Sequence, residues 1–150
     1  MKMLRPYFCV SVLAVPFGLL AGCPTNPPPG DGDSCSPQAD GGATTVSYAN
    51  DIVPILTAGN CLTSACHGGT IPSGDYDMRT YQSLFVAGES ARELDVCEIV
   101  RGDPESSFLF EKISSNNPRR GLPMPQEREP LTDAEIALIE TWIREGAQDN

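Results

Sequence analysis

The sequence predicts an all-α domain built from a few short helices and long loops. Three segments combine a helix-start residue with apolar residues at helical spacing, and they begin near Asn50, Asp103 and Thr132. The chain also carries 14 prolines and 14 glycines, many of which stand between these segments. Because proline and glycine interrupt regular structure, the connections should be irregular. A length of 150 residues allows one such domain with extra chain at the ends.

The first residues have the pattern of an export signal. A positively charged start is followed by an apolar stretch that is too short and too interrupted to be a convincing spanning helix. It ends in Leu20-Ala21-Gly22-Cys23, which resembles a bacterial lipoprotein signal. We therefore expect residues 1–22 to be removed and Cys23 to carry lipid. The exported protein would then be anchored to a membrane, in the periplasm or at the cell surface. The alternative is a plain secretory signal cut nearby.

A tether should separate the anchor from the folded domain. Residues 24–45 contain several prolines and glycines but no Leu, Ile, Val or aromatic residue. Such a composition cannot bury a core. We therefore divide the mature chain into a tether over residues 23–46 and a domain over residues 47–150.

The charge of the chain limits its partners. Twenty acidic and ten basic residues give a formal net charge of −10. This balance argues against nucleic acid as a partner, because a phosphate backbone attracts basic surfaces. It favours a protein partner with a basic patch, although an acidic surface can also serve solubility alone.

A short apolar helix should open the domain. Asn50 or Asp51 would cap it, and residues 52–56 supply its apolar side chains. Pro54 is tolerable because it falls in the first turn. Gly59 would end the helix immediately before a cysteine-rich stretch.

That stretch is Cys61-Leu62-Thr63-Ser64-Ala65-Cys66-His67, and it contains the only histidine of the chain. Two cysteines followed at once by histidine are typical of covalent haem attachment, in which the thiols bond the porphyrin edge and the imidazole ligates iron. The usual spacing is C-x-x-C-H, whereas this stretch reads C-x-x-x-x-C-H. Gly68 and Gly69 would let the backbone turn close to a flat ring.

Three other interpretations of this stretch stay open. Cys61 and Cys66 could form a local disulfide in an oxidising compartment. The same cysteines and His67 could hold zinc with Cys97 as the fourth ligand. His67 could also be an ordinary surface residue, which would leave its position beside Cys66 unexplained.

Two further helices are expected in the middle of the domain. Apolar residues recur at helical spacing from about 79 to 86, and Gly88 would stop that helix. Asp103 and Pro104 form a helix-start signal, with the aspartate as cap and the proline at the first position. This third helix should end near Ser115.

The last helix has the clearest local signature. Residues 116–130 are too rich in proline for regular structure. They are followed by a capping box between Thr132 and Glu135, and Gly146 is placed to close the helix. Three apolar residues share one face of this helix: Ile136, Ile139 and Ile143.

A haem iron that serves electron transfer needs a sixth ligand as well as His67. The chain has no second histidine, so the candidates are Met78 and Met124. Met124 stands between Pro123 and Pro125, which restrict its movement, whereas Met78 falls on the apolar face of an expected helix. We therefore expect Met124 to ligate iron, since a thioether raises the reduction potential relative to a second histidine.

The remaining cysteines form an even pair. Of the six cysteines, one would leave with the signal, one would take lipid and two would bind haem. This leaves Cys35 and Cys97, which we expect to form a disulfide that ties the end of the tether to the domain. The competing pair, Cys61 with Cys97, would require that no haem is attached.

The order of these features resembles a small single-haem class I cytochrome c domain. The resemblance covers about residues 47–147, and the longer cysteine spacing departs from it. It implies that Cys61 and Cys66 form the thioether bonds, that His67 is the proximal ligand and that Met124 is the distal ligand. The fold would consist of short helices and long loops wrapped round one covalent haem c.

The resemblance also implies how the ends of the domain pack. In such domains the first and last helices cross, which would put Trp142 and Ile139 against Ile52 and Leu56. About twenty large apolar side chains in roughly a hundred residues make a thin core. A buried haem would supply the missing apolar surface, so the domain without haem should be at best partly folded.

The expected function is electron transfer to a redox protein partner, which needs no catalytic group. A haem with an open sixth position could instead act on a small oxidant such as peroxide. A third alternative is a haem-free interaction domain that keeps a cytochrome-like fold with disulfides in place of haem.

Overall fold

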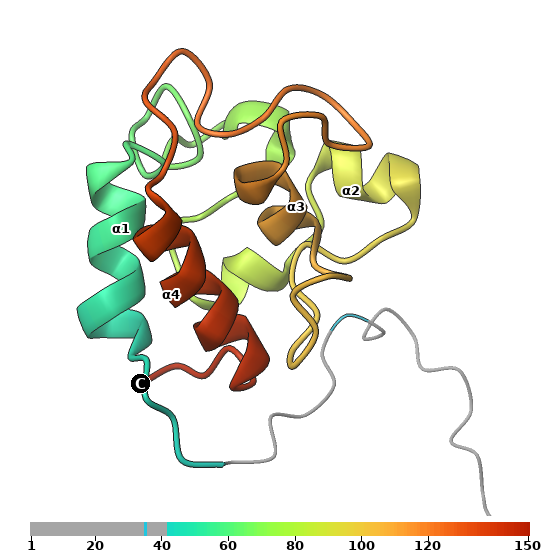
Figure 1. Cartoon of the computed structure of the whole chain (residues 1–150). Helices are drawn as coiled ribbons and strands as arrows, with labels where there is room; N and C mark the ends of the chain where they lie inside the picture. The colour runs from blue at the N-terminus through green and yellow to red at the C-terminus, as the bar shows by residue number, and fades with distance from the viewer. Residues whose placement is uncertain (1–34, 36–41) are drawn as a thin grey trace, which may run out of the picture.

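The computed structural model describes residue 35 and residues 42–150. The expected export signal, Cys23 and most of the tether therefore lie outside the described residues. The described part is helical and contains no strand (Figure 1). Its elements in chain order are η1 (Tyr48–Ile52), α1 (Val53–Ala58), η2 (Ser73–Asp75), η3 (Gln82–Phe85), α2 (Glu89–Leu94), α3 (Phe108–Ser114) and α4 (Asp133–Arg144). None of the helices in this part is long and apolar enough to cross a membrane.

The first helix begins earlier than the sequence predicts. The wide turn η1 runs directly into α1, and its cap is Ser47, whose hydroxyl accepts a hydrogen bond from the N–H of Asn50. The expectation that Asn50 or Asp51 caps the helix is therefore wrong. Asp51 instead reaches back to accept from the N–H of Ser47 at 2.8 Å. Gly59 ends the helix as predicted.

The helix expected over residues 79–86 is shorter than predicted. Only Gln82–Phe85 is helical, as the single 3-10 turn η3, because the hydroxyls of Thr80 and Ser83 bond each other and the local backbone. Gly88 does not stop a helix but precedes α2, which the sequence reasoning missed. Ala91 is the one buried residue of α2, so the segment carries no apolar stripe that would reveal a helix.

The third helix begins later than predicted. Ser107 precedes α3, so the assignment of Asp103 as its cap and Pro104 as its first residue is wrong. Asp103 caps a turn instead, since its carboxylate accepts from the N–H of Ser106 at 3.1 Å. The buried hydroxyl of Ser107 donates to the carbonyl of Asp103 and accepts from the N–H of Val100, which holds this turn against the helix.

The last helix confirms its sequence signature. The Thr132 hydroxyl accepts from the Glu135 N–H, and the Glu135 carboxylate accepts from the Thr132 N–H, so both halves of the capping box are present. Gly146 has a φ of +96° just after the helix, which is the left-handed conformation that favours glycine.

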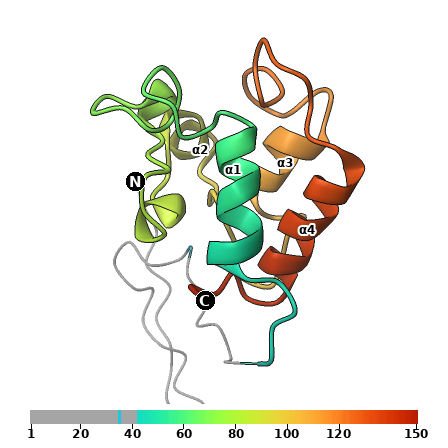
Figure 2. The same ribbon diagram turned by 90° about the vertical axis from the view of Figure 1, so that its left-hand side faces the viewer.

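The two ends of the domain pack together, and α4 lies beside the helix formed by η1 and α1 in both ribbon views (Figures 1 and 2). Tyr48 stacks on Trp142 with 5.5 Å between ring centroids. Ile52, Ile139 and Trp142 are each 1% exposed and belong to one core. Burying such large apolar side chains supplies most of the favourable free energy of folding.

Hydrogen bonds join the chain before Ser47 to the C-terminus. Glu145 accepts from the N–H of Thr45 and from that of Val46, and the Asn150 side chain donates to the Thr44 hydroxyl at 2.7 Å. Val46 is only 4% exposed. Ordered contacts of the domain therefore extend into the last residues of the segment expected to be a tether.

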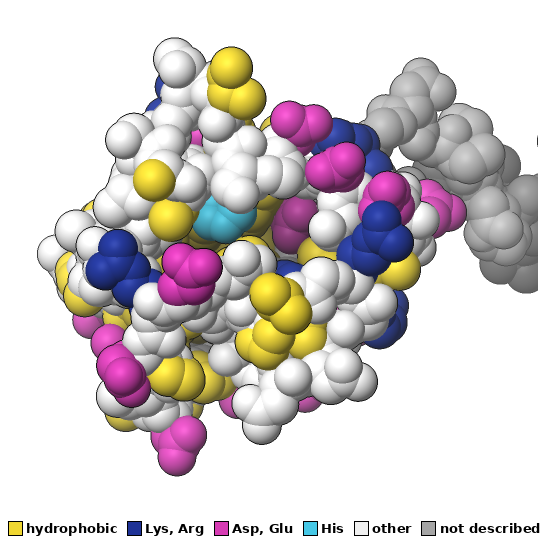
Figure 3. All heavy atoms as spheres, turned by 90° about the horizontal axis from the view of Figure 1, so that it is seen from above, with side chains coloured by type: hydrophobic (Ala, Val, Ile, Leu, Met, Phe, Trp, Pro, Cys, Tyr) yellow, Lys and Arg dark blue, Asp and Glu magenta, His cyan; other side chains and the backbone are white. Residues whose placement is uncertain are grey.

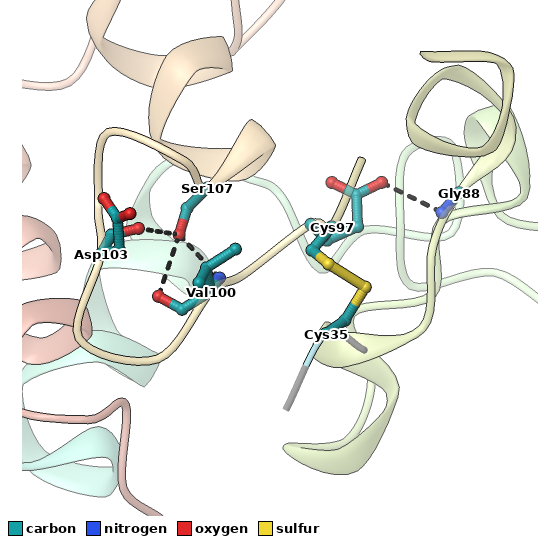
Figure 4. Close-up of a disulfide and its surroundings, with 7 residues drawn as sticks. Cys35, Gly88, Cys97, Val100, Asp103 and Ser107 are labelled. Carbon is teal, nitrogen blue, oxygen red and sulfur yellow. Dashed lines mark hydrogen bonds between the residues drawn. A yellow bond between two sulfur atoms is a disulfide. The ribbon is translucent and has the colours of Figure 1, made fainter. Parts of the chain in front are cut away.

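A disulfide joins Cys35 to Cys97, with an S–S distance of 2.04 Å (Figure 4). It is the pairing that the cysteine count predicted, and it connects residues 62 positions apart. The competing pair of Cys61 with Cys97 is therefore absent. The bond attaches the described part of the tether beside the segment that leads to α3.

Candidate functional site

Backbone hydrogen bonds close the cysteine-rich loop tightly. The N–H of Cys61 donates to Leu56 O at the end of α1, and the N–H of His67 donates to Cys61 O, each at 2.9 Å. The N–H of Cys66 and that of Gly68 both donate to Thr63 O at 3.0 Å. The longer C-x-x-x-x-C-H spacing is therefore folded into a compact loop.

Two glycines make this closure possible. A Cβ at Gly68 would lie 1.9 Å from Leu62 O, and a Cβ at Gly69 would lie 2.6 Å from Ser64 O. Side-chain atoms are not found this close to backbone oxygen. In the structure these glycines leave room for the backbone of the loop itself.

Cys61 and Cys66 are half-buried free thiols. Burial raises the pKa of the Cys61 thiol, and the nearby charge of Cys66 acts in the same direction against an opposing backbone hydrogen bond. Redox-active thiols usually have lowered pKa values, so a raised pKa does not suit thiol–disulfide exchange. The local Cys61–Cys66 disulfide considered from the sequence is absent from the structure.

His67 is held by the chain that follows it. Its Nδ1 lies 3.0 Å from Tyr76 O, and its ring stands 5.5 Å from the Tyr76 ring, edge to face. A carbonyl oxygen only accepts, so Nδ1 carries the proton and the lone pair of Nε2 is available for a metal. Burial lowers the pKa of His67, with a smaller contribution from the charge of Lys112, while hydrogen bonds with the backbone of Tyr76 and Ser73 oppose the shift. A lowered pKa favours the neutral imidazole that ligation requires.

Met124 is half-buried in the irregular loop over residues 116–130. Its N–H donates to Lys112 O in α3 at 2.7 Å, which ties the loop to the helix. Met78 is only 5% exposed and belongs to the core, where it packs as an ordinary apolar residue.

The loop of His67 and the loop of Met124 lie at the same end of the domain. They overlap at the top of Figure 1, and the turned view in Figure 2 separates them to opposite sides. Figure 3 looks down on this end and shows a hollow with hydrophobic side chains in its floor and the histidine at its edge. The two predicted ligand loops therefore lie at the end of the domain that carries this hollow.

Sequence reasoning missed two residues near this end. Tyr76 orients His67 through its carbonyl, and no local sequence pattern marks a backbone contact of this kind. Glu98 is 4% exposed and accepts from the N–H of Gly88 at 3.0 Å, which is the dashed line drawn to Gly88 in Figure 4. Burial raises the pKa of Glu98 to about 7, against the N–H of Gly88 and the charges of Lys112 and Arg92.

The donor set fits a haem better than a bare metal ion. Two free thiols and an imidazole with an available Nε2 belong to one loop, and Met124 supplies a thioether in a second loop at the same end of the domain. No three His, Cys, Asp or Glu side chains among residues 35 and 42–150 converge as metal ligands. Cys97 is also taken by its disulfide, so the zinc interpretation lacks its fourth ligand.

Comparison with known proteins identifies the type of domain. Residues 63–127 match the family described as Planctomycete cytochrome C, which is less than half of the chain. The matched residues include Cys66, His67 and Met124 and begin at Thr63, where the usual C-x-x-C-H spacing would place the first cysteine. No curated protein and no solved structure matched the chain. The chain therefore contains a cytochrome c-like domain.

Proposed function

We propose that this domain binds one covalently attached haem and transfers electrons to a redox protein partner. The observation that carries the proposal is the position of His67, with its Nε2 available, at the edge of a hollow in the end of the domain where the loop of Met124 also lies. Cys61 and Cys66 would supply the two thioether bonds. A haem bound in this way supplies a reversible one-electron change at its iron.

The residues around the hollow would set the properties of that site. The Tyr76 carbonyl fixes the tautomer and the ring orientation of His67, and a hydrogen bond at Nδ1 makes the opposite nitrogen a better donor. Met124 would complete the coordination with a soft thioether, which raises the reduction potential.

The same end of the domain exposes two large apolar side chains. Ile71 is 87% exposed in the segment that follows His67, and Leu122 is 63% exposed in the loop of Met124. Exposed apolar side chains on both loops favour close and transient contact with another protein. The net charge of −10 would favour a partner with a basic patch.

We also propose that the protein is exported and anchored through lipid on Cys23. The Cys35–Cys97 disulfide supports export, because such bonds persist in oxidising compartments. Replacement of Cys23 by Ser should move the protein from the membrane fraction to the soluble fraction. Retention of Cys23→Ser in washed membranes would contradict lipid anchoring.

An absorption spectrum tests the haem and its ligands. Residues 24–150 would be produced in cells that have haem-attachment machinery, and a denaturing gel would be stained for covalent haem. The expected result is covalent haem with a low-spin reduced spectrum and a weak sulfur-to-iron band in the oxidised state. Met124→Ala should remove that band and leave the haem attached.

Two other results would redirect the proposal. A high-spin spectrum would indicate an open sixth position and would favour chemistry on a small oxidant such as peroxide. A colourless protein without free thiols would contradict both haem functions. It would favour an interaction domain stabilised by disulfides in place of haem.

A further inference from the structure

The Lys112 side chain holds the loop that carries Met124. Its ammonium donates to Arg120 O at 2.9 Å and also to Leu122 O. The Lys112 carbonyl accepts from the N–H of Met124 at 2.7 Å. One residue of α3 therefore bonds three successive parts of this loop, and two of these bonds are made by a charged donor, which strengthens them.

The loop is shaped around the ammonium. Gly121 has a φ of +68°, a conformation that glycine adopts readily, and a Cβ at this position would lie 3.1 Å from Lys112 Nζ. The chain therefore bends round the cation at the one residue that leaves room for it. Arg120 and Leu122 stand on either side of Gly121, and the bend lets both of their carbonyls accept hydrogen bonds from the same ammonium.

We propose that Lys112 is a positioning residue that keeps Met124 facing the hollow. This rests on the proposed function, in which Met124 ligates haem iron. The loop has no helix or strand of its own, so the ammonium adds to the backbone hydrogen bond between Met124 and Lys112 in fixing its path. Without that ammonium the loop opens, and the Met124 sulfur leaves its place while the cysteines still hold the haem.

The test compares haem-loaded Lys112→Met, Lys112→Arg and the unchanged protein in the full chain. Arg119 and Arg120 are exposed in the held loop, so the rate of trypsin cleavage after them reports opening of the loop. Lys112→Met should be cut about tenfold faster, since it loses two hydrogen bonds from a charged donor. It should also lose the sulfur-to-iron band and retain covalent haem.

Matched variants separate positioning from a general loss of stability. Lys112→Arg keeps a cationic donor and should retain the band. Arg144→Met removes a cation from α4, where its partners are Glu105 and Glu140, and should change neither readout. If Lys112→Met does not accumulate, Gly121→Ala serves as the second variant, because its Cβ would lie 3.1 Å from Lys112 Nζ and displace the ammonium. It should weaken the sulfur-to-iron band and speed trypsin cleavage.

The outcomes distinguish this inference from the proposed function. A band that is present in the unchanged protein, lost in Met124→Ala and retained in Lys112→Met would overturn the positioning role alone. If the unchanged protein and Met124→Ala have the same oxidised spectrum, Met124 is not a ligand, and the ligand assignment and the positioning role fall together. Cleavage of Lys112→Met at an unchanged rate would show that the ammonium does not hold the loop.

Discussion

The loop of His67 and the loop of Met124 lie at the same end of the domain, but they are held by different means. The loop of His67 closes on itself through backbone hydrogen bonds and two tightly packed glycines. The loop of Met124 has one backbone bond to α3 and is otherwise held by side chains, since Lys112 bonds its carbonyls, Glu111 pairs with Arg119 at 2.6 Å and Glu93 of α2 pairs with Arg120. The loop of His67 should therefore be fixed by the backbone, and the loop of Met124 should be adjustable through single side chains.

The largest expected effect on stability comes from adding a methyl group to the loop of His67. Gly68→Ala would place its Cβ against Leu62 O, and backbone cannot move aside as a side chain can. We expect a loss of about 4 kcal/mol in the free energy of unfolding, together with little haem attachment. Urea unfolding and haem staining measure these two quantities.

Gly42→Ala is the matched control, because no atom lies within 4 Å of a Cβ there. Gly121→Ala should cost less than Gly68→Ala, since it meets only the far end of a lysine side chain. Equal losses at Gly68 and Gly121 would contradict the distinction between the two loops.

A second prediction uses pH to test Glu98, whose pKa responds to the Lys112 charge. Its carboxyl has a pKa of about 7 in the fold against an ordinary value of 4.5, so between these values the folded state binds more protons than the unfolded state. The contribution of Glu98 to the free energy of unfolding should therefore fall by about 3 kcal/mol as pH rises from 4.5 to 7, while the lowered pKa of His67 acts in the opposite direction. Denaturant titrations at a series of pH values measure this slope.

Glu98→Gln should remove most of that fall, because glutamine cannot ionise. Glu140→Gln removes a half-buried carboxylate that pairs with Arg144 on α4, and it is the matched control for this loss of slope. A Glu98→Gln protein with the same pH dependence as the unchanged protein would show that Glu98 ionises normally.

A third prediction concerns the apolar side chains that each loop exposes. Ile71→Ser combined with Leu122→Ser should slow electron transfer to a basic-surfaced cytochrome about threefold, because apolar contact at the site of encounter is lost. Stopped-flow kinetics measure this rate. The rate of electron transfer to ferricyanide should stay the same in this double variant. The control Leu138→Ser should change neither the rate with the cytochrome nor the rate with ferricyanide. An equal slowing with ferricyanide would instead indicate damage to the haem site.

The smallest expected effect on stability comes from the ion pair between Glu111 and Arg119 in the loop of Met124. Glu111→Gln removes the ion pair with Arg119, which is half exposed, so the free energy of unfolding should fall by less than about 1 kcal/mol. Trypsin cleavage after Arg119 should rise about twofold. An effect as large as that of Lys112→Met would place the main support of the loop at Glu111.

Short-range signals in the sequence predicted part of this arrangement. The capping box of Thr132 and Glu135 lies within one helical turn, and the structure contains both of its hydrogen bonds. Asp103 misled the prediction of α3, because an aspartate before proline caps a turn as readily as a helix. Helix α2 left no periodic signal, since Ala91 is its one buried residue.

The site itself was predictable only where its residues are neighbours in the sequence. The stretch from Cys61 to His67 can be recognised from the sequence alone. The contact of His67 with Tyr76 O, in contrast, depends on the path of the chain between them. The part played by Lys112 requires α3 and the loop of Met124 to be placed together in space. Such contacts between distant segments leave no local pattern.

The Cys35–Cys97 disulfide determines where the domain would bear mechanical load. A pull on the chain before residue 35 would enter the domain at Cys97, whose carbonyl accepts a hydrogen bond from Phe108 at the start of α3. The hydrogen bonds of Thr44 and Thr45 with the C-terminal residues would be bypassed. Tension would therefore reach the interior of the domain without peeling away its first residues.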